Sequence, residues 1–466
     1  MKIFPLIAAV AAPLWLAGCA TTAPPPPAVT APPQWYAPLP HQGAVADLAQ
    51  WWQQFNDPLL VQLVESAQAA SPSVASARSR IEQARALRTN ANAALLPTLD
   101  AQASAARGNT QPPTPLATTL QAGLLAGWEI DLFGGNKQAL RAAQARLEAA
   151  QAGWHDARVS VAAETASSYV NLRSCAQLRT VAENDAQSRA ETARLADLSA
   201  QAGFTAPATA ALARASAAEA SVRLIQQATQ CDLEVKVLVE LTAMPEPQLR
   251  QQLAQAWPAP VHLLTERPML ALPAQLLTQR PDVYQAELDV AAASADIGYA
   301  QAQRYPRLTL NGSVAAGVVR IGGETVDAQT WSIGPLAVSL PLFDGGRRAA
   351  NVDAATARYD ESVALYTARV RQAVREVEQA LVTLESARLR LVDAQTSYEG
   401  YRAFYLATEA RYRSGLGSLV ELEDARRNSL LAETQLVLMQ RERVSAWVAL
   451  YRAVGGGWSR PEAPSA

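Results

Sequence analysis

Residues 72–99, PSVASARSRIEQARALRTNANAALLPTL, return 209 positions later as residues 281–308, PDVYQAELDVAAASADIGYAQAQRYPRL. The two stretches align without a gap, and both prolines of the first coincide with both prolines of the second. A second landmark, DLFGGNK from Asp131, is matched by PLFDGGRR from Pro341 at an offset of 210. This period is too long for a solenoid or a propeller blade. The chain therefore contains two tandem copies of one block, and its function must use that block twice.

The N-terminus has the pattern of a bacterial lipoprotein signal. Lys2 supplies a positive charge, and residues 3–16 form an apolar segment that is too short to span a bilayer. The box LAGC at 16–19 then places small residues before a cysteine. We therefore predict a signal peptide at 1–18 and a covalent lipid on Cys19, the mature N-terminus. An ordinary secretory signal with a chance cysteine is the alternative.

The residues after the cysteine favour an extended, lipid-anchored tether. Ala20 resembles the residue found there in lipoproteins that are passed on to the outer membrane. Residues 21–40 are rich in proline and cannot form a helix or a central strand, so we expect a tether over 19–45. The whole chain has a net charge of −2 and is 49% hydrophobic. This balance fits a globular or rod-like helical protein and gives no reason to expect a nucleic-acid partner.

Four segments alternate apolar and polar residues with the period of β-strands. They lie at 98–105 and 120–132 in the first copy, and at 308–317 and 331–342 in the second. We expect β-hairpins at 98–132 and 308–343, with a phase change near Gly334 and loops near 108–118 and 318–329. Their lengths suit membrane strands, although soluble hairpins that lie on a helical body are the alternative. Four strands cannot close a barrel, which takes about eight, so a membrane role requires several chains to pool their strands.

Two long segments, 137–202 and 347–414, contain no proline and almost no glycine. As helices, at about 1.5 Å per residue, each could reach about 100 Å. In the second segment, apolar residues recur at spacings of three, four and seven, as in a coiled coil, and Arg388 interrupts the pattern. This predicted seam consists of Val370, Val374, Val377, Leu381, Leu384 and Leu391.

Each long segment ends at a glycine that could form a helix C-terminus, Gly203 or Gly415. Pro207 suits the first turn of a returning helix. We therefore predict antiparallel helical hairpins at 134–243 and 345–453. The resulting domain plan has a first repeat at 46–265, a second repeat at 266–455 and a C-terminal tail at 456–466.

Four motifs, in their order along the chain, resemble the TolC-like outer-membrane efflux proteins. They are WWQQFNDPLLVQLVESA from Trp51, QRPDVYQAELDVAAASADIGYAQAQRYPRLTLNGS from Gln279, PLFDGG from Pro341 and RYRSGLGSLVELEDARR from Arg411. The resemblance is closest to the NodT-type lipoprotein branch that serves resistance-nodulation-division (RND) pumps, and it covers nearly all of the mature chain. It implies a mainly α fold with a small β part. Three chains would pool four strands each into a twelve-stranded outer-membrane β-barrel, continued by a periplasmic α-barrel of coiled-coil hairpins.

The resemblance implies conduction rather than chemistry. In similar proteins the hairpin tips form a periplasmic mouth that opens when an adaptor, the membrane fusion protein, docks. The matching tip residues here are Gly203, Phe204, Gly415 and Leu416. Alignment of SLVELEDARR with the inward-facing helix of the family implies a pore gate of Glu421, Asp424 and Arg427, with Tyr412 before the tip. Acidic rings in such a pore favour cations. Plain helix caps and an ordinary solvated face are the alternatives.

Two cysteines remain once Cys19 carries the lipid. Cys175 and Cys231 each lie 28 residues from Gly203, on opposite sides of it. In an antiparallel hairpin that turns at this glycine, the two cysteines therefore reach the same height. Because the periplasm is oxidising, we predict a disulfide between them, with two inert core thiols as the alternative.

The chain shows no sign of an enzyme. His41, His155 and His262 have no ligand spacing, and no phosphate loop, nucleophile elbow or zinc motif is present. We expect neither a metal nor a cofactor besides the lipid. The predicted function is the outer-membrane channel of a tripartite efflux system with an RND pump, anchored in the outer membrane and extending into the periplasm. A lipid-anchored periplasmic coiled-coil spacer and a channel for type I protein secretion are the alternatives.

Overall fold

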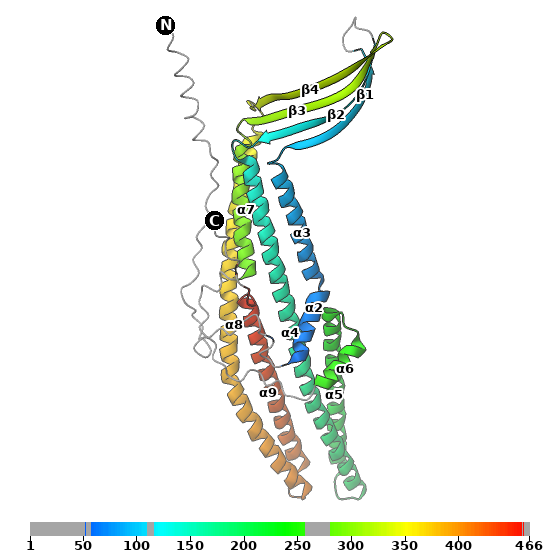
Figure 1. The fold of residues 1–466 in the computed structure, drawn as a ribbon. Helices are drawn as coiled ribbons and strands as arrows, with labels where there is room; N and C mark the ends of the chain where they lie inside the picture. The colour runs from blue at the N-terminus through cyan, green and yellow to red at the C-terminus, as the bar shows by residue number, and fades with distance from the viewer. Residues whose placement is uncertain (1–51, 53–56, 110–115, 257–279, 459, 461–466) are drawn as a thin grey trace, which may run out of the picture. The chain divides into compact units, whose positions relative to one another are not determined.

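The computed structural model describes Trp52, residues 57–109, 116–256 and 280–458, and Arg460. The chain divides into two units, and each unit combines segments of both sequence copies (Figure 1). The described part of the first unit consists of Arg78–Ala152 and Tyr284–Arg369. The second unit contains the described residues of Thr30–Ala77, Gly153–Val283 and Val370–Ala466. Cys19 and the predicted tether lie outside the described residues.

The first unit contains one antiparallel sheet with the strand order β1-β2-β3-β4. Its strands are β1 (Thr98–Gly108), β2 (Ala117–Ile130), β3 (Arg307–Ile321) and β4 (Glu324–Ser339). Both predicted hairpins are confirmed. In addition β2 and β3, which belong to different copies, pair from Ala117 with Ile321 to Ile130 with Leu308. The two copies are thus joined edge to edge, and β1 and β4 are the outer strands.

The second hairpin is longer than expected, and the prediction of a loop at 318–329 is wrong. The strands β3 and β4 continue through most of that range, and only Gly322 and Gly323 lie between them. Both glycines have positive φ, +58° and +98°, which suits a two-residue hairpin turn and requires no side chain to adopt a strained backbone. The predicted phase change is present: the pairing register shifts between Leu310 and Gly312, opposite Gly334.

The two faces of the sheet differ in chemistry. The register places large apolar side chains from all four strands on one face: Leu99, Leu120, Leu124, Trp128, Leu310, Val314, Val318, Trp331, Ile333, Leu336 and Val338. The opposite face carries Asp100, Gln102, Ser104, Gln121, Glu129, Thr309, Asn311, Ser313 and Ser332. Many of the apolar side chains are exposed, with Ile333 exposed at 85%. Within the part of the chain that the structure describes, most of the apolar face is therefore exposed.

Helices of both copies pack below the sheet in the first unit. They are the greater part of α3 (Pro72–Ala93) and α7 (Pro281–Ala302), and the starts of α4 (Gly135–Gln201) and α8 (Arg347–Arg413). The helix α7 contacts α4 through the Arg146–Asp296 ion pair, and it contacts α8 through Ile297 and Ala300, which pack on Ala355. The helix α7 thus has neighbours on two sides, whereas most of α3 is exposed.

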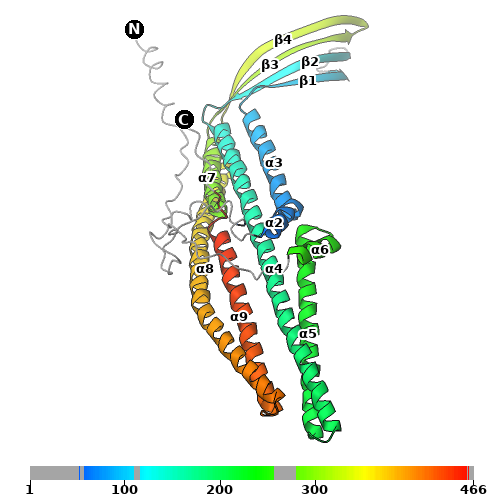
Figure 2. The same ribbon diagram turned by 60° about the horizontal axis from the view of Figure 1, so that its bottom comes forward.

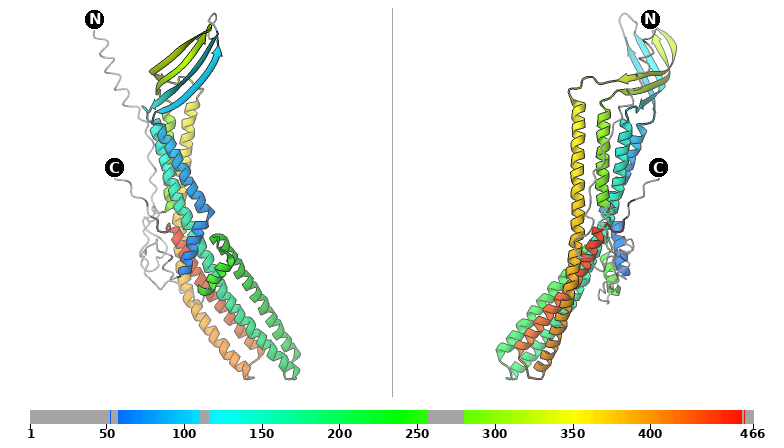
Figure 3. Two further views of the ribbon diagram at one scale, coloured as in Figure 1. Left: turned by 45° about the vertical axis from the view of Figure 1, so that its right-hand side comes forward. Right: turned by 90° about the vertical axis from the view of Figure 1, so that its left-hand side faces the viewer.

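The second unit contains the greater part of both predicted helical hairpins, including their turns. The long helices α4 and α8 begin and end within two residues of the predicted segments, and they return as α5 (Pro207–Thr242) and α9 (Leu419–Ala453). The helices lie side by side in the order α8, α9, α4, α5 (Figures 2 and 3). The Arg390–Glu442 ion pair connects α8 with α9. Hydrogen bonds from Arg426 to Ser188 and Thr192 connect α9 with α4. The helices α4 and α5 are joined by a disulfide.

The seam of α8 differs in part from its prediction. Val370, Val377, Leu381 and Leu384 are buried as expected, whereas Val374 and Leu391 are only half-buried. Three alanines complete the seam at seven-residue spacing, namely Ala373, Ala380 and Ala387. Small side chains at these positions allow the neighbouring helix to approach closely, and a search for large apolar residues overlooks them. Arg388 is exposed and pairs with Glu385, as its place outside the seam requires.

Two short helices lie on the second unit, α2 (Pro58–Ala70) and α6 (Glu246–Ala256). The carboxylate of Asp57 anchors α2, because it accepts hydrogen bonds from the N–H groups of Leu59 and Leu60 at the helix start. The same carboxylate accepts from the Tyr169 hydroxyl at 2.7 Å and the Arg173 guanidinium at 3.0 Å, both on α4. None of the described helices is long and apolar enough to cross a membrane.

Candidate functional site at the hairpin tips

Both hairpins turn with the same backbone motif. At the end of α4, the Phe204 N–H donates to the Ser199 carbonyl at 2.9 Å, and the Gly203 N–H donates to the Ala200 carbonyl at 3.1 Å. At the end of α8, Leu416 and Gly415 repeat this pattern with distances of 2.9 and 3.0 Å. These are Schellman motifs, and each requires a left-handed residue at the glycine position. Gly203 and Gly415 have φ of +77° and +74°, so a side chain at either position would strain the turn.

Each turn presents a large apolar side chain to solvent. Phe204 is 87% exposed and Leu416 is 73% exposed. Both follow the turn glycine directly. Pro207 then begins α5, as predicted. The tips therefore combine a rigid turn with an apolar side chain that the single chain leaves uncovered.

Immediately behind the tips, the two hairpins are packed together. The buried residues of this tip cluster come from three helices: Ala193 and Ala196 of α4, Ala210 and Ala213 of α5, and Leu419 and Leu422 of α9. Tyr405 and Tyr412 of α8 pack against them. Tyr412, one of the predicted gate residues, is thus a half-buried packing residue between the hairpins.

The structure places the other three predicted gate residues on one exposed face of α9. Glu421 and Ser418 form a capping box, in which each backbone N–H donates to the side chain of the other at 3.1 Å. The cap occupies one carboxylate oxygen of Glu421. One turn further on, Asp424 and Arg427 form an ion pair, with side chains exposed at 54% and 63%. Two acids and one arginine leave one net negative charge per chain on this face.

A buried polar network lies directly beneath this face, and the sequence analysis missed it. The Glu423 carboxylate of α9 pairs with Arg189 of α4, accepts from Arg426 at 2.6 Å, and accepts from Ser216 of α5 at 2.8 Å. Arg189 also pairs with Asp185 at 2.8 Å. The side chains of Arg189, Asp185 and Arg426 are exposed by less than one-tenth. Buried charges persist only when they are paired in this manner.

Arg426 extends the network from α9 to α4 and α8. Its guanidinium donates to the hydroxyls of Ser188 and Thr192, both at 3.1 Å. It also lies over the ring of Tyr405, at 5.8 Å from the ring centroid. The sequence gives only a weak signal for this network. Glu423 and Arg426 lie next to buried residues of the same helix, and their pattern in the sequence is that of a charged surface. Only the packing of α4 against α9 shows that they are inside.

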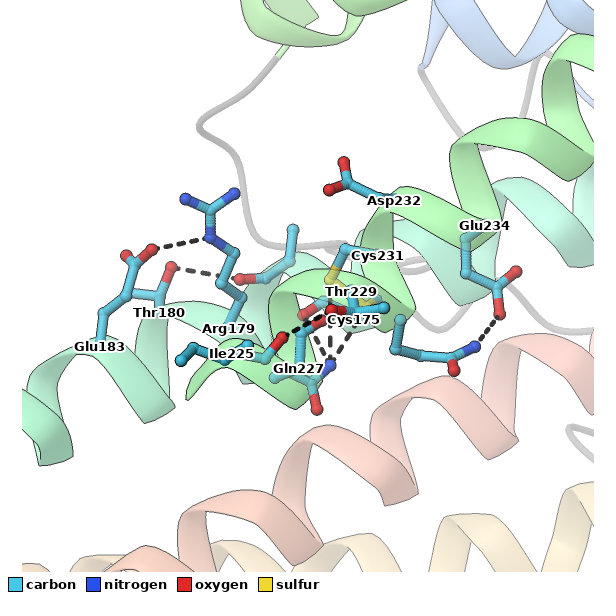
Figure 4. Close-up of a disulfide and its surroundings, with 12 residues drawn as sticks. Cys175, Arg179, Thr180, Glu183, Ile225, Gln227, Thr229, Cys231, Asp232 and Glu234 are labelled. Carbon is cyan, nitrogen blue, oxygen red and sulfur yellow. Dashed lines mark hydrogen bonds and ion pairs between the residues drawn. A yellow bond between two sulfur atoms is a disulfide. The ribbon is translucent and has the colours of Figure 1, made fainter. Parts of the chain in front are cut away.

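A disulfide joins the first hairpin at the height that the equal spacing predicts. The sulfur atoms of Cys175 on α4 and Cys231 on α5 are 2.09 Å apart, and the Cα atoms are 5.5 Å apart. Both cysteines are buried. The Gln227 side-chain amide donates to the Cys175 carbonyl at 3.3 Å and lies 3.1 Å from its sulfur (Figure 4). Exposed pairs such as Arg179 with Glu183 surround the bond.

Comparison with known proteins identifies the family of this chain. The sequence matches the family model described as outer membrane efflux protein over residues 63–243 and 272–456. This chain belongs to the outer membrane efflux protein family. The two matched segments correspond to the two copies of the repeat. Within the described residues, no group of three or more histidine, cysteine, aspartate or glutamate side chains could hold a metal ion.

Relatives within the outer membrane efflux protein family match along nearly their whole length. The pyoverdine export outer membrane protein OpmQ of Pseudomonas aeruginosa is 28% identical over 477 residues, covering 98% of this chain and 97% of OpmQ. Outer membrane protein OprJ of the same species is 31% identical over 452 residues, covering 90% of this chain and 88% of OprJ. The crystal structure of the Campylobacter jejuni CmeC outer membrane channel is 26% identical, with a TM-score of 0.83 and coverage of 94% and 96%.

Proposed function

We propose that this protein is the outer-membrane channel of a tripartite efflux system and conducts small molecules delivered by an inner-membrane RND pump and a periplasmic adaptor. The observation that carries the proposal is the sheet with one apolar face, one polar face and two open edges. An apolar face suits lipid and a polar face suits a water-filled lumen. Membership of the outer membrane efflux protein family supports the same function.

The open edges of the sheet support a homotrimer. The strands β1 and β4 each have one edge without a partner strand among the described residues. In hydrocarbon an unsatisfied backbone group costs several kcal/mol, so lipid-exposed open edges do not occur. Three chains with four strands each would form a closed sheet of twelve strands, in which β4 of one chain pairs with β1 of the next.

The helical layer supports the same assembly, because its two outermost helices carry uncovered apolar stripes. The exposed apolar residues are Val222, Ile225, Leu233 and Val237 on α5, and Val382, Leu389, Val392 and Phe404 on α8. Most of them recur at spacings of three, four and seven, which is typical of a helix that packs on another helix. In a trimer, α8 of one chain would pack on α5 of the next and close a periplasmic tunnel.

The tips of the hairpins would form the periplasmic mouth and the adaptor-docking surface. Phe204 and Leu416 are large apolar side chains that rigid turns hold exposed, and exposed apolar surface marks sites of protein interaction. Glu421, Asp424 and Arg427 would face the pore, since they share one exposed face of α9. Three copies of this face about the channel axis concentrate negative charge and favour cations. The Cys19 lipid would anchor each chain in the outer membrane.

Conduction and assembly can be tested on one preparation. Full-length lipoprotein is extracted from outer membranes, its mass is measured by native mass spectrometry, and it is reconstituted in planar bilayers for single-channel recording. We expect a mass of three chains and a cation-selective conductance. A monomer or dimer without conductance would refute the channel and favour the lipid-anchored spacer. If the protein is a trimer, but deletion of its gene blocks export of a protein and leaves small-molecule efflux intact, the result would favour the type I secretion channel.

A further inference from the structure

The two sequence copies meet inside the chain at a joint of four residues, Phe133, Gly135, Ala302 and Tyr305. The rings of Phe133 and Tyr305 stack with centroids 4.9 Å apart and planes at 12°. Beside them Gly135 lies against α7, because a Cβ at this position would meet the Ala302 Cβ at 3.0 Å. The joint therefore connects the start of α4, in the first copy, with the end of α7, in the second.

Because the block is repeated, residues equivalent to both sides of this joint occur a second time in the chain. At the offset of 210 that relates the strand-to-helix turns, Phe133 corresponds to Phe343. The extra residue Asp344 then shifts the two glycines by one position, so Gly135 corresponds to Gly346. At the offset of 209 that relates the α3 and α7 segments, Ala302 corresponds to Ala93 and Tyr305 to Leu96. We define the outer joint as these four equivalents: Phe343, Gly346, Ala93 and Leu96.

The outer joint is exposed among the residues that the structure describes. Phe343 is 92% exposed and Leu96 is 57% exposed. A Cβ built on Gly346 would meet no described heavy atom within 4 Å. By contrast, Phe133 and Tyr305 are half-buried and Ala302 is buried. At the inner joint these residues pack against the other copy of the repeat. Their equivalents at the outer joint are exposed.

Burial of the helices and the order of the strands agree with this. The helix α7 packs on α4 on one side and on α8 on the other, whereas Ala84 is the one buried residue of α3 among those in the first unit. The strands β2 and β3 pair across the inner joint, and their equivalents β4 and β1 are the outer strands. Among the described residues, both the helices and the sheet therefore lack a neighbour at the outer joint.

We infer that a second copy of this chain occupies the outer joint, with Phe343 of one chain packed on Leu96 of the next and Gly346 beside Ala93. The contact repeats between chains the one that joins the copies within the chain. Phe343 and Leu96 would both lose water-exposed apolar surface, which is favourable. Gly346, directly before the start of α8, permits close approach there, as Gly135 does at the inner joint. The inference rests on the proposed homotrimer and names its contact below the sheet.

Cysteine cross-linking tests the contact. The Leu96→Cys/Phe343→Cys double variant is oxidised in the membrane and run on non-reducing gels. We expect covalent species of two and three chains. The Phe133→Cys/Tyr305→Cys variant, which places the same pair at the inner joint, should cross-link without any change in chain mass. A Leu87→Cys/Phe343→Cys variant should stay uncross-linked, since Leu87 lies nine residues, about 13 Å, back along α3.

The outcomes separate the two proposals. A trimer by native mass that gives no cross-link between positions 96 and 343 refutes the outer joint and leaves the channel function intact. A monomer by native mass refutes the trimer and, with it, the outer joint. Equal cross-linking from positions 87 and 96 would also refute it, because it would show non-specific collision.

A truncation pair tests the same contact without introducing thiols. Leu342 and Phe343 are almost equally exposed, at 89% and 92%, but Leu132, the equivalent of Leu342, is 56% exposed at the inner joint. Phe343→Ala should therefore lower the temperature at which the trimer dissociates, and Leu342→Ala should leave it unchanged. Equal effects of the two substitutions would overturn the assignment of Phe343 to the joint.

Discussion

Replacing Glu423 by alanine tests whether the buried polar network holds the two hairpins together behind the tips. In the wild type, its carboxylate binds Arg189, Ser216 and Arg426. The Arg189 and Arg426 side chains are only 8% and 4% exposed, so neither can regain water without movement of the helices. Arg189 keeps its pair with Asp185, but Arg426 would stay buried without a carboxylate. Removing one partner from a buried ion pair costs about 3–5 kcal/mol, since the remaining charge stays buried and unpaired.

Hydrogen–deuterium exchange of the detergent-solubilised protein measures this cost locally. A change of 1.4 kcal/mol alters an equilibrium constant tenfold, so the loss corresponds to about 10²- to 4 × 10³-fold faster exchange where local opening controls it. We expect the increase in peptides from the start of α9 and from α4 around Arg189. Peptides from the sheet should exchange as in the wild type. Glu423→Gln, which keeps the side-chain length but not the charge, should give an intermediate increase.

Glu191→Ala is the matched control. Glu191 also pairs with an arginine three residues later, Arg194, but both side chains are more than half exposed. Solvent screens such surface pairs, and removing one partner leaves no buried charge. Exchange in α4 should therefore change little in this variant. Unchanged exchange in Glu423→Ala, or an equal increase in both variants, would show that the network does not hold the hairpins.

Three further predictions concern the disulfide, the gate face and pH. Changing Cys175 and Cys231 together to serine opens a loop with a sequence separation of 56, and should cost about 4 kcal/mol in the chain-entropy model, seen as a lower unfolding temperature; an unchanged temperature would contradict this. Glu421→Gln with Asp424→Asn leaves the arginine of that face as its net charge, so reconstituted pores should lose cation preference; unchanged reversal potentials would remove both acids from the gate. Burial, and then a nearby arginine, lowers the pKa of His155 below its ordinary 6.5. The unfolded chain then binds more protons, so stability should fall as pH drops below 6.5, and the His155→Gln variant should melt with a weaker pH dependence.

Much of the helical architecture could be predicted from local signals. The absence of proline and the turn glycines placed the long helices within two residues of their observed bounds. The equal spacing of Cys175 and Cys231 from Gly203 placed both cysteines at one height, because an antiparallel hairpin fixes height by residue count. Such features depend on one hairpin at a time, so its own sequence suffices.

The features that escaped prediction depend on contacts between distant segments. Arg426 is buried and Glu423 is half-buried because α4 packs on α9, and nothing in their own helix distinguishes them from Asp424 and Arg427, which are exposed. The capping box of Glu421 could have been predicted, since a serine three residues before a glutamate is its signature, but the residue was assigned from the resemblance alone. A single-chain sequence pattern reports which residues are charged and leaves their surroundings open.

The disulfide makes the two copies of the block mechanically unequal. The positions 28 residues before and after Gly415 are Ala387 and Arg443, so the second hairpin has no cross-link at the equivalent height. Axial sliding of α4 against α5 would have to break a covalent bond, whereas α8 and α9 are restrained by side-chain packing and ion pairs. The duplicated block thus provides one stiff arm and one compliant arm, and a load applied at the tips would deform the second arm first.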